Sequence, residues 1–420
     1  MKNQIKSFIY SALVAALLVQ CQSTPTVKTG EWRATLQTSG GELPFGIDIQ
    51  PGAKAGTYTV FAVNGSERFK MDEATLQGDS LHIPMALFES ELVGKVDGDK
   101  LTGTWRKRRT KDQFQYVPFA ATFGAASRFS SGEKSAATAS NGTFSGKWQT
   151  LFRAEPTGNV PGDTTLAVGI FDQKGTDVTG TFLTPTGDYR YLAGNAIGDS
   201  LLLSCFDGSH AFLFKAKKGP GNLLTGVFHS GPTYRETWTA QLNPNAKLPD
   251  PAKLTFVKPG QKFTFAFPDP TGKTVSLTDP RFAGKVTIVQ IMGSWCPNCM
   301  DETKFLAPWY AKNKARGVEA VALAYEKSPG LAVSGPKLQR MAERFQMQYP
   351  VLLAGTNDKA EAAKTLPALN AVLAFPTTIF VDKKGQVRHI HTGFSGPGTG
   401  VYYDQYVAEF NRLIDKLLAE

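Results

Sequence analysis

The sequence predicts a multidomain protein: an all-β N-terminal region of two similar antiparallel β-barrel or β-sandwich repeats, followed by a C-terminal α/β domain. Three observations support this fold class. Residues 29–245 alternate apolar with polar positions and carry turn residues at intervals of about 8–12, which indicates short antiparallel strands. The same region contains two sets of matching motifs. The rest of the chain holds an apolar run, typical of a buried strand, that leads directly into a helical pattern.

The N-terminal region is predicted to be duplicated, because three short motifs recur in the same order at similar spacing. The pairs are Gly30–Trp32 with Gly146–Trp148, Gly78–Leu81 with Gly198–Leu201, and Leu101–Trp105 with Leu224–Phe228. Each copy has room for about eight short strands, which is enough for a small barrel or sandwich. We therefore expect two β-domains of the same fold.

Composition sets the expected domain limits. The four units are residues 1–21 as an export signal, 29–124 and 142–245 as β-repeats 1 and 2, and 255–420 as the α/β domain. Residues 125–140, rich in Ser and Ala, are predicted to link the repeats, and residues 243–260, with four prolines, to link repeat 2 to the α/β domain. The repeats show no catalytic constellation, since Asp79-Ser80 and Asp199-Ser200 are explained as turn residues. Partner binding and a spacer role stay open for them.

Two cysteines in a CxxC motif, Cys296 and Cys299, are the strongest indication of chemistry in the chain. The motif follows residues 286–292, which are typical of a buried strand, and leads into residues 300–310, which are typical of a helix. The dipole and the free N–H groups at a helix start stabilise a thiolate there. Because the thiolate is the nucleophile of disulfide exchange, the motif predicts a redox centre.

Other uses of a CxxC motif fit this chain less well. A structural zinc site needs four ligands, but Cys21 and Cys205 are far apart in the chain, and only His389 and His391 form a close histidine pair. Covalent haem attachment needs a histidine directly after the second cysteine, where this chain has Met300. An inert disulfide across two residues would stabilise little, since its effect grows with the loop that it closes. We therefore expect no metal at this site.

The CxxC motif and the later segment Phe375-Pro376-Thr377 together resemble the thioredoxin superfamily. Within it, the sequence is most similar to the bacterial envelope thiol–disulfide reductases of the TlpA/ResA-like group, which carry a redoxin domain. The resemblance covers residues 255–420 and includes the family's opening hairpin, further strands and closing helix, at residues 263–273, 277–285, 318–324, 387–394 and 402–418. It implies a thioredoxin fold for the α/β domain.

The resemblance also implies a role for each residue of the motifs. Cys296 would be the attacking thiolate, and Cys299 would be the resolving thiol that breaks the mixed disulfide. Pro376 would be the family's cis-proline, with an ordinary strand-edge proline as the alternative. The implied supporting residues are Trp295, Pro297, Asn298 and Glu302, and the implied substrate-binding residues are Phe375, Pro376 and Thr377. No organic cofactor is implied beyond a redox-active disulfide between the two cysteines.

Two further positions separate this chain from the cytosolic thioredoxins. Thioredoxins carry a buried aspartate where this chain has Gln290, which cannot titrate. Envelope members often have a glutamate at the position of Glu302, so Glu302 is a candidate for relaying protons near Cys299. The helix dipole favours a glutamate in a first turn in any case, so a purely structural role stays open.

The N-terminus predicts export. Lys2 and Lys6 precede the apolar residues 8–19, which is the pattern of a secretory signal and too short for a spanning helix. The residues before Cys21 resemble a bacterial lipoprotein box, in which this cysteine is lipidated, although Gln20 departs from that pattern. An ordinary secreted protein is the alternative. We expect a periplasm-facing lipoprotein of the bacterial cell envelope, attached to the membrane through its N-terminal lipid.

Charge adds little to these predictions. The formal net charge of +10 is spread along the chain, and the dense cluster at Arg106, Lys107, Arg108 and Arg109 is interpreted as a solvated hairpin. Contact of this cluster with anionic lipid headgroups is the alternative. No nucleic-acid-binding motif is present in the sequence, so nucleic acid is not expected as a partner.

Three functions are compatible with these observations. The main hypothesis is an envelope thiol–disulfide oxidoreductase that reduces disulfide-containing proteins. A membrane electron donor would then reduce the oxidised enzyme again. The second is a thiol peroxidase of the peroxiredoxin type, which shares the fold, but residues 290–295 do not supply the peroxiredoxin cysteine pattern. The third is a binding lipoprotein whose redox domain is vestigial, against which the intact CxxC motif weighs.

Overall fold

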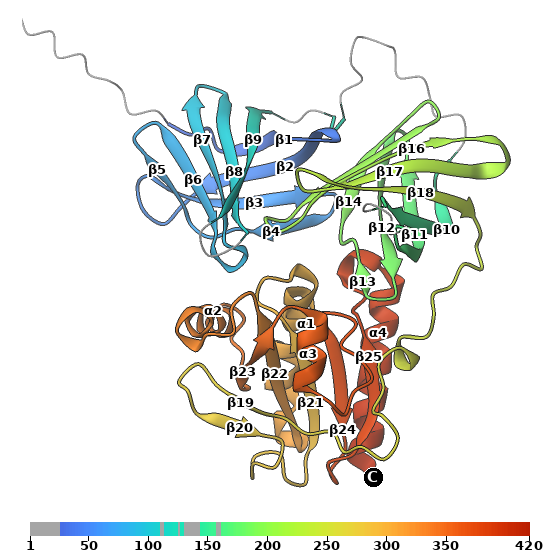
Figure 1. Ribbon diagram of the computed structural model, residues 1–420. Helices are drawn as coiled ribbons and strands as arrows, with labels where there is room; N and C mark the ends of the chain where they lie inside the picture. Colours follow the sequence, from blue (N-terminus) through green and yellow to red (C-terminus); the bar gives the residue numbers. More distant parts are fainter. Residues whose placement is uncertain (1–25, 110–112, 125–126, 130–142, 157–160) are drawn as a thin grey trace, which may run out of the picture.

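The computed structural model describes residues 26–109, 113–124, 127–129, 143–156 and 161–420. The predicted export signal, residues 1–21, and the lipidation candidate Cys21 lie outside these ranges. Two β-barrels lie side by side, and both face one end of an α/β domain (Figure 1). No helix within the described ranges has the length and apolar character needed to cross a membrane.

Barrel 1 is a closed antiparallel sheet. Its strands are β1 (Gly30–Thr38), β2 (Gly41–Pro51), β3 (Thr57–Asn64), β4 (Glu67–Lys70), β5 (Ala74–Gln77), β6 (Ser80–Met85), β7 (Ser90–Asp97), β8 (Lys100–Arg108) and β9 (Phe114–Phe123), with a 3-10 turn η1 at Ala86–Phe88. The order β2-β1-β9-β8-β7-β6-β5-β3 closes through a β2–β3 pairing, and the short β4 pairs with β3. Alternate residues point inward, so Trp32, Phe45 and Trp105 fill the interior.

Barrel 2 repeats this topology strand for strand. Its strands are β10 (Gly146–Ala154), β11 (Thr164–Lys174), β12 (Asp177–Thr184), β13 (Gly187–Asp188), β14 (Leu192–Ile197), β15 (Ser200–Phe206), β16 (Ala211–Lys218), β17 (Leu223–Ser230) and β18 (Tyr234–Leu242), with η2 at Pro220–Asn222. They follow the order β11-β10-β18-β17-β16-β15-β14-β12, closed by β11–β12, with β13 on β12. The predicted pair of similar β-repeats is confirmed, and both are barrels.

Local details of the two barrels also match. The indole N–H of Trp32 donates to the carbonyl of Lys28, and that of Trp148 donates to the carbonyl of Phe144, four residues earlier in each case. Gly30 and Gly146, which open the matching strands, both have φ of 121°, a conformation that favours glycine. The first of the motifs that reveal the duplication in the sequence therefore has the same local structure in both barrels.

The α/β domain has a five-stranded sheet. Its strands are β21 (Val286–Met292), β22 (Val318–Glu326), β23 (Val351–Thr356), β24 (Thr377–Val381) and β25 (Val387–Thr392), preceded by the hairpin β19 (Ala266–Pro268) and β20 (Thr274–Ser276). The order is β23-β22-β21-β24-β25; β22 is parallel to both β21 and β23, and β24 is antiparallel to β21 and β25. All seven residues of β21 are buried, as a central strand covered on both faces requires.

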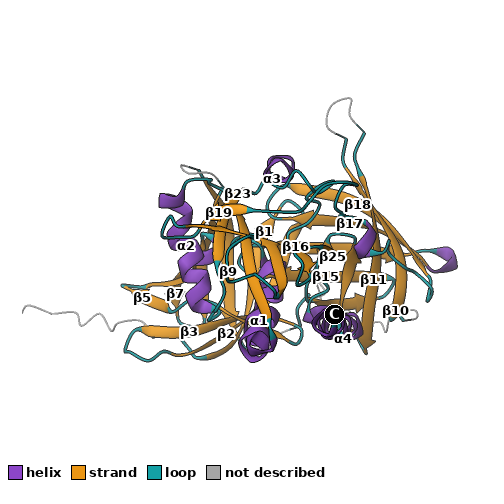
Figure 2. Ribbon diagram, turned by 90° about the horizontal axis from the view of Figure 1, so that it is seen from below, coloured by secondary structure: helices purple, strands orange, loops and turns teal. Residues whose placement is uncertain are grey.

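Helices cover this sheet. They are α1 (Pro297–Asn313), α2 (Leu331–Arg344), α3 (Lys359–Thr365) and α4 (Val401–Ala419), with the 3-10 turns η3 (Pro251–Lys253), η4 (Lys314–Arg316) and η5 (Pro397–Thr399). Helices α1 and α4 pack together through the edge-to-face rings of Phe305 and Phe410. Figure 2 shows α4, with the C-terminus, beside strands β10 and β11 of barrel 2. There, Lys147 lies 5.5 Å from the ring centre of Tyr402.

The interpretation of the basic cluster as a solvated hairpin is wrong for Lys107, whereas Arg106 and Arg109 are exposed to solvent. Lys107 lies between the barrels, where its ammonium donates to the Ser209 carbonyl at 2.5 Å, and burial lowers its pKa to about 8. Arg106 and Arg108 form ion pairs with Glu91 and Glu89. For Lys107 the prediction was wrong because local sequence cannot show that the end of β8 meets a second barrel.

The predicted linker between the repeats is also partly packed. Of residues 125–140, the structure describes 127–129. Within them, the Arg128 guanidinium donates to the carbonyl of Val63 in barrel 1 and to the carbonyl of Ser204 in barrel 2. This part of the segment therefore joins the barrels through partly buried hydrogen bonds.

Candidate redox site

The strand–helix junction after β21 places both cysteines. Cys296 is the N-cap residue of α1, and its Sγ accepts a hydrogen bond from the backbone N–H of Cys299 at 3.4 Å. Pro297 occupies the first helical position, where a missing N–H costs nothing because that donor would be unpaired. Cys299 lies one turn into the helix and is fully buried, whereas Cys296 is 7% exposed. Cys296 is therefore the more accessible of the two cysteines.

A second segment completes the sulfur environment. The thiol of Cys296 donates to the carbonyl of Phe375 at 3.3 Å, and the Phe375–Pro376 peptide bond is cis. The Phe375 ring meets the Trp295 indole edge-to-face, with ring centres 5.8 Å apart. Thr377 begins β24, next to β21 in the sheet. The structure thus brings Trp295, both cysteines, Phe375 and Pro376 together, while their assigned roles stay predictions.

Glu302 lies behind Cys299 in the core of the domain. Its carboxylate accepts hydrogen bonds from the Gln290 amide at 2.8 Å, from the Tyr406 hydroxyl at 3.2 Å and from the Thr378 hydroxyl. Burial raises the pKa of Glu302 to about 7, although these three donors act in the opposite direction. Burial also raises the pKa of the Cys299 thiol well above its usual value, and the nearby Glu302 carboxylate adds to this. A carboxyl that titrates near neutrality therefore lies beside a thiol that is slow to ionise by itself.

The sequence indicates Gln290 and Glu302 as separate positions, whereas in the structure their side chains are hydrogen-bonded. Thr378 and Tyr406, which the sequence did not indicate, complete the same hydrogen-bond network. Thr378 directly follows the motif residue Thr377, so a search along β24 could have found it. Tyr406 belongs to the buried face of α4, and no local pattern connects it with the cysteines.

A second buried carboxylate holds the loop before the motif. Glu326, the last residue of β22, accepts hydrogen bonds from the Ser294 backbone N–H at 2.7 Å and from the Ser294 hydroxyl at 2.8 Å. The Trp295 indole N–H donates to the neighbouring Tyr325 carbonyl at 2.8 Å. These contacts fix the loop that delivers Cys296. The signal in the sequence was an acidic residue at the end of an apolar strand.

Barrel 2 makes direct contact with the CxxC motif, which nothing in the sequence indicated. The Ser209 hydroxyl donates to the Trp295 carbonyl at 3.3 Å. The Asn298 amide, between the cysteines, donates to the Asp188 carbonyl at 3.0 Å. Arg190 donates to the Pro297 carbonyl at 3.3 Å. The backbone around the cysteines is thus covered by loops of another domain.

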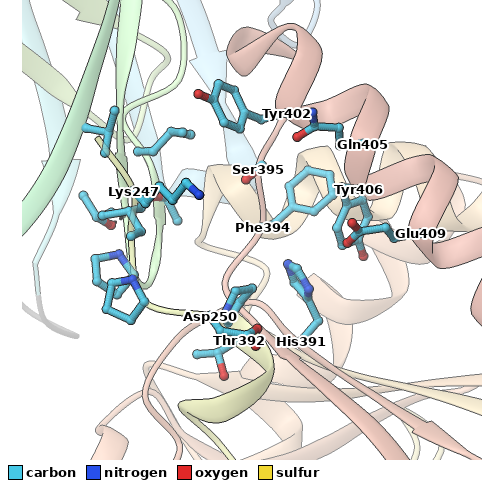
Figure 3. A pocket seen from close by; sticks show the side chains of 18 of the residues that line it. Lys247, Asp250, His391, Thr392, Phe394, Ser395, Tyr402, Gln405, Tyr406 and Glu409 are labelled. Carbon is cyan, nitrogen blue, oxygen red and sulfur yellow. Dashed lines mark hydrogen bonds between the residues drawn. The ribbon is translucent and has the colours of Figure 1, made fainter. Parts of the chain in front are cut away.

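A cavity of about 610 Å³ lies between barrel 2, residues 246–251 and helix α4 (Figure 3). Figure 3 shows His391 and Tyr406 on its wall, and the Tyr406 hydroxyl also donates to Glu302. Burial, and secondarily His389, lowers the pKa of His391 to about 4, so this ring is neutral near neutral pH. Through Tyr406 the cavity adjoins the hydrogen-bond network of Glu302.

Within the described ranges, no group of three or more His, Cys, Asp or Glu side chains is arranged to hold a metal ion. The described cysteines, Cys205, Cys296 and Cys299, are all free thiols in this structure. Cys205 is buried in β15, and burial raises its pKa well above the usual value.

A CxxC motif at the start of a helix, a cis-proline segment beside it and the sheet order described above define a thioredoxin-like domain. Residues 258–405 match the Redoxin family. Residues 258–405 are therefore a redoxin domain.

Curated relatives of the TlpA/ResA-like group are similar to this part of the chain. The chain is 30% identical over 131 residues to the thiol-disulfide oxidoreductase ResA of Geobacillus kaustophilus, covering 31% of this chain and 66% of the relative. It is 28% identical over 159 residues to the ResA of Halalkalibacterium halodurans, covering 37% of this chain and 75% of the relative. A solved thiol:disulfide interchange protein of the thioredoxin family from Chlorobium tepidum superimposes with a TM-score of 0.30 at 21% identity, over 39% of this chain and 99% of that one.

Proposed function

We propose that the protein is a thiol–disulfide oxidoreductase that reduces protein disulfides in the bacterial cell envelope. The observation that carries this proposal is the pair of cysteines at the start of α1: Cys296 accepts the Cys299 N–H and lies 3.3 Å from the Phe375 carbonyl of the cis-proline segment. A backbone N–H donor and a position at a helix start are the features by which proteins prepare a cysteine for thiol–disulfide exchange.

The proposed reaction has two exchange steps. In the first, the Cys296 thiolate attacks one sulfur of a substrate disulfide; a Cys296–substrate disulfide forms and the other substrate sulfur leaves as a thiolate. In the second, the Cys299 thiolate attacks the Cys296 sulfur, so the Cys296–Cys299 disulfide forms and the substrate leaves as a dithiol. Substrate gains two electrons, and the enzyme loses them.

Glu302 would be the proton acceptor for Cys299 in the second step. Because burial keeps Cys299 protonated, the thiol must lose a proton as it attacks, and Glu302, with a pKa of about 7, is a base suited to accept it near neutral pH. The chemistry rests on the two sulfurs and requires no metal or organic cofactor. Trp295, Pro297 and Asn298 support the site, and Phe375, Pro376 and Thr377 bind the backbone of the substrate.

The proposal includes the cellular location of the protein and its electron donor. Lipidation of Cys21 would anchor the chain to a membrane on its periplasmic side, and a membrane dithiol donor would reduce the Cys296–Cys299 disulfide in this oxidising compartment. The sequence pattern before Cys21 and the relation to ResA support this placement.

Insulin disulfide reduction with a chemical dithiol donor tests the proposal. We expect activity that Cys296→Ser abolishes, whereas Cys299→Ser accumulates a mixed disulfide with the substrate. Cys205→Ala, a buried thiol in barrel 2, serves as the matched control and retains activity. A reduction potential near −270 mV supports the reductase direction, and a value near −120 mV would indicate an oxidase.

The two rival functions give different results in the same assays. Peroxide consumption that survives Cys299→Ser would favour the thiol peroxidase. Absence of both activities from the purified chain would favour the binding lipoprotein with a vestigial redox domain.

A further inference from the structure

Arg190 is a buried cation at the place where barrel 1, barrel 2 and the α/β domain meet. It lies in the three-residue link between β13 and β14, and its side chain is 1% exposed. Its guanidinium forms ion pairs with Glu67 of barrel 1, with Asp207 of barrel 2 at 3.0 Å and with Asp301 of α1. The described part of each body therefore contributes one carboxylate to the same arginine.

The same guanidinium also touches the redox motif. One of its N–H groups donates at 3.3 Å to the carbonyl of Pro297, the residue that follows Cys296. Asp301, its partner on α1, is two residues after Cys299. Arg190 is thus bound to the N-terminal part of α1 on both sides of Cys299, although it belongs to barrel 2.

The burial of Arg190 makes its ion pairs important for the energy of the folded state. In a site of low dielectric constant charges are screened weakly, so a buried arginine that loses its carboxylate partners destabilises the protein. Lys304 and His210 are the other basic groups in contact with these carboxylates, at 2.9 Å from Asp301 and 3.0 Å from Asp207. Both are more exposed than Arg190, so Arg190 is the most buried of the three basic groups that pair with these carboxylates.

We propose that Arg190 is a positioning residue of the redox centre, through which the docked barrels set the dithiol–disulfide equilibrium of Cys296 and Cys299. This inference rests on the proposed redox role of that pair and adds a function for the barrels. They are a part of the active site and not only a spacer or a partner-binding module.

The charges of Arg190 and Asp301 determine the direction in which each would shift the dithiol–disulfide equilibrium. A positive charge at the first turn of α1 favours a thiolate at Cys296 and therefore the dithiol over the disulfide. Loss of the Arg190 charge removes this stabilisation and leaves Asp301 to repel the thiolate. Loss of the Asp301 charge, with Arg190 kept, favours the thiolate and therefore the dithiol.

Equilibration of the full chain with reduced and oxidised glutathione tests this, with the dithiol fraction read by thiol alkylation and mass spectrometry. We expect Arg190→Gln to lower the equilibrium constant for reduction about tenfold, equal to a potential about 30 mV more negative. We expect Asp301→Asn, which keeps the shape and the hydrogen-bond acceptor, to raise it about threefold. Arg344→Gln, which removes the 2.5 Å ion pair with Asp72 of barrel 1 away from the motif, is the control and leaves it unchanged.

The opposite signs exclude a merely structural role, which would shift both variants alike. Equal constants for wild type, Arg190→Gln and Asp301→Asn, or shifts of the same sign, overturn the inference and leave the proposed function standing. If the wild-type pair does not exchange with glutathione, the inference and the proposed function fall together. Should Arg190→Gln not fold, Asp301→Asn decides alone, because Arg190 then keeps Glu67 and Asp207 as partners. In that case a constant that is unchanged or lowered overturns the inference.

Discussion

The two barrels share one strand order and reach the redox domain in different ways. In each, a short strand is followed by a three-residue link, residues 71–73 after β4 and residues 189–191 after β13. The middle residue is Asp72 in barrel 1 and Arg190 in barrel 2. Both form ion pairs with the redox domain, but with opposite charge: Asp72 with Arg344 at the end of α2, and Arg190 with Asp301 on α1.

Burial separates these equivalent positions. The Asp72–Arg344 pair is more than a quarter exposed on both sides, whereas Arg190 is 1% exposed. An exposed pair contributes about 0–1 kcal/mol, while removal of one partner from a buried pair costs about 3–5 kcal/mol. At equivalent positions, the link of barrel 1 thus makes a surface contact, and the link of barrel 2 makes a buried contact with helix α1.

The largest predicted effect is on stability at this pair of links. Arg190→Met leaves three buried carboxylates with one counter-charge fewer, so we expect the free energy of unfolding to fall by about 3–5 kcal/mol. Asp72→Asn at the equivalent position should cost less than about 1 kcal/mol. Urea unfolding followed by circular dichroism measures both. Similar losses in the two variants would remove the contrast between the barrels.

A second prediction separates the two faces of α1. Asp301 faces the barrels, and Glu302 faces the core, where Gln290, Thr378 and Tyr406 donate to it. Its raised pKa means that Glu302 favours the folded state below pH 4.5 and that this contribution is lost as pH rises through about 7. Between these values we expect wild type to lose roughly 3 kcal/mol of stability relative to Glu302→Gln.

Unfolding midpoints at several pH values, compared between wild type and Glu302→Gln, measure this difference. Asp301→Asn is the matched control on the neighbouring residue. If the difference between wild type and Glu302→Gln does not grow with pH, the pH response does not arise on the core face of α1. Insulin reduction should also fall in Glu302→Gln, because Cys299 loses its base.

A third comparison concerns two equivalent loops, the β6–β7 loop of barrel 1 and the β15–β16 loop of barrel 2. The β6–β7 connection of barrel 1 carries Glu89, and the β15–β16 connection of barrel 2 carries Ser209. The Ser209 hydroxyl donates to the Trp295 carbonyl, so Ser209→Ala should cost about 1 kcal/mol and change the fluorescence of Trp295. Ser80→Ala, in an exposed turn of barrel 1, should change neither. An unaltered emission spectrum in Ser209→Ala would show that this contact does not shape the motif.

Sequence alone could predict what is local or repeated. The CxxC motif and the Phe375-Pro376 segment are short patterns, and the duplication is visible because turn glycines and tryptophans recur. The choice between barrel and sandwich stayed open, because closure depends on the β2–β3 and β11–β12 pairings. Arg190 and Lys107 could not be found, since their burial arises from docking of domains that are distant in the chain.

The smallest predicted effect tests whether barrel 1 docks only by surface charge. Glu89 pairs with Lys337 at 3.0 Å and with Lys327 at 3.5 Å. Partial burial raises the pKa of Glu89, but Lys337, Lys327 and Arg108 outweigh it, so the pKa is lowered overall. A lowered pKa gives stability that is present above pH 4.5 and is lost as pH falls through the folded value. Because the pair is partly solvated, Glu89→Gln should cost no more than about 1 kcal/mol at pH 7 and nothing once Glu89 is protonated. Unfolding midpoints at pH 7 and in acid, at low and high salt, measure this. A loss that salt does not reduce would mean that barrel 1, like barrel 2, is held by buried charge.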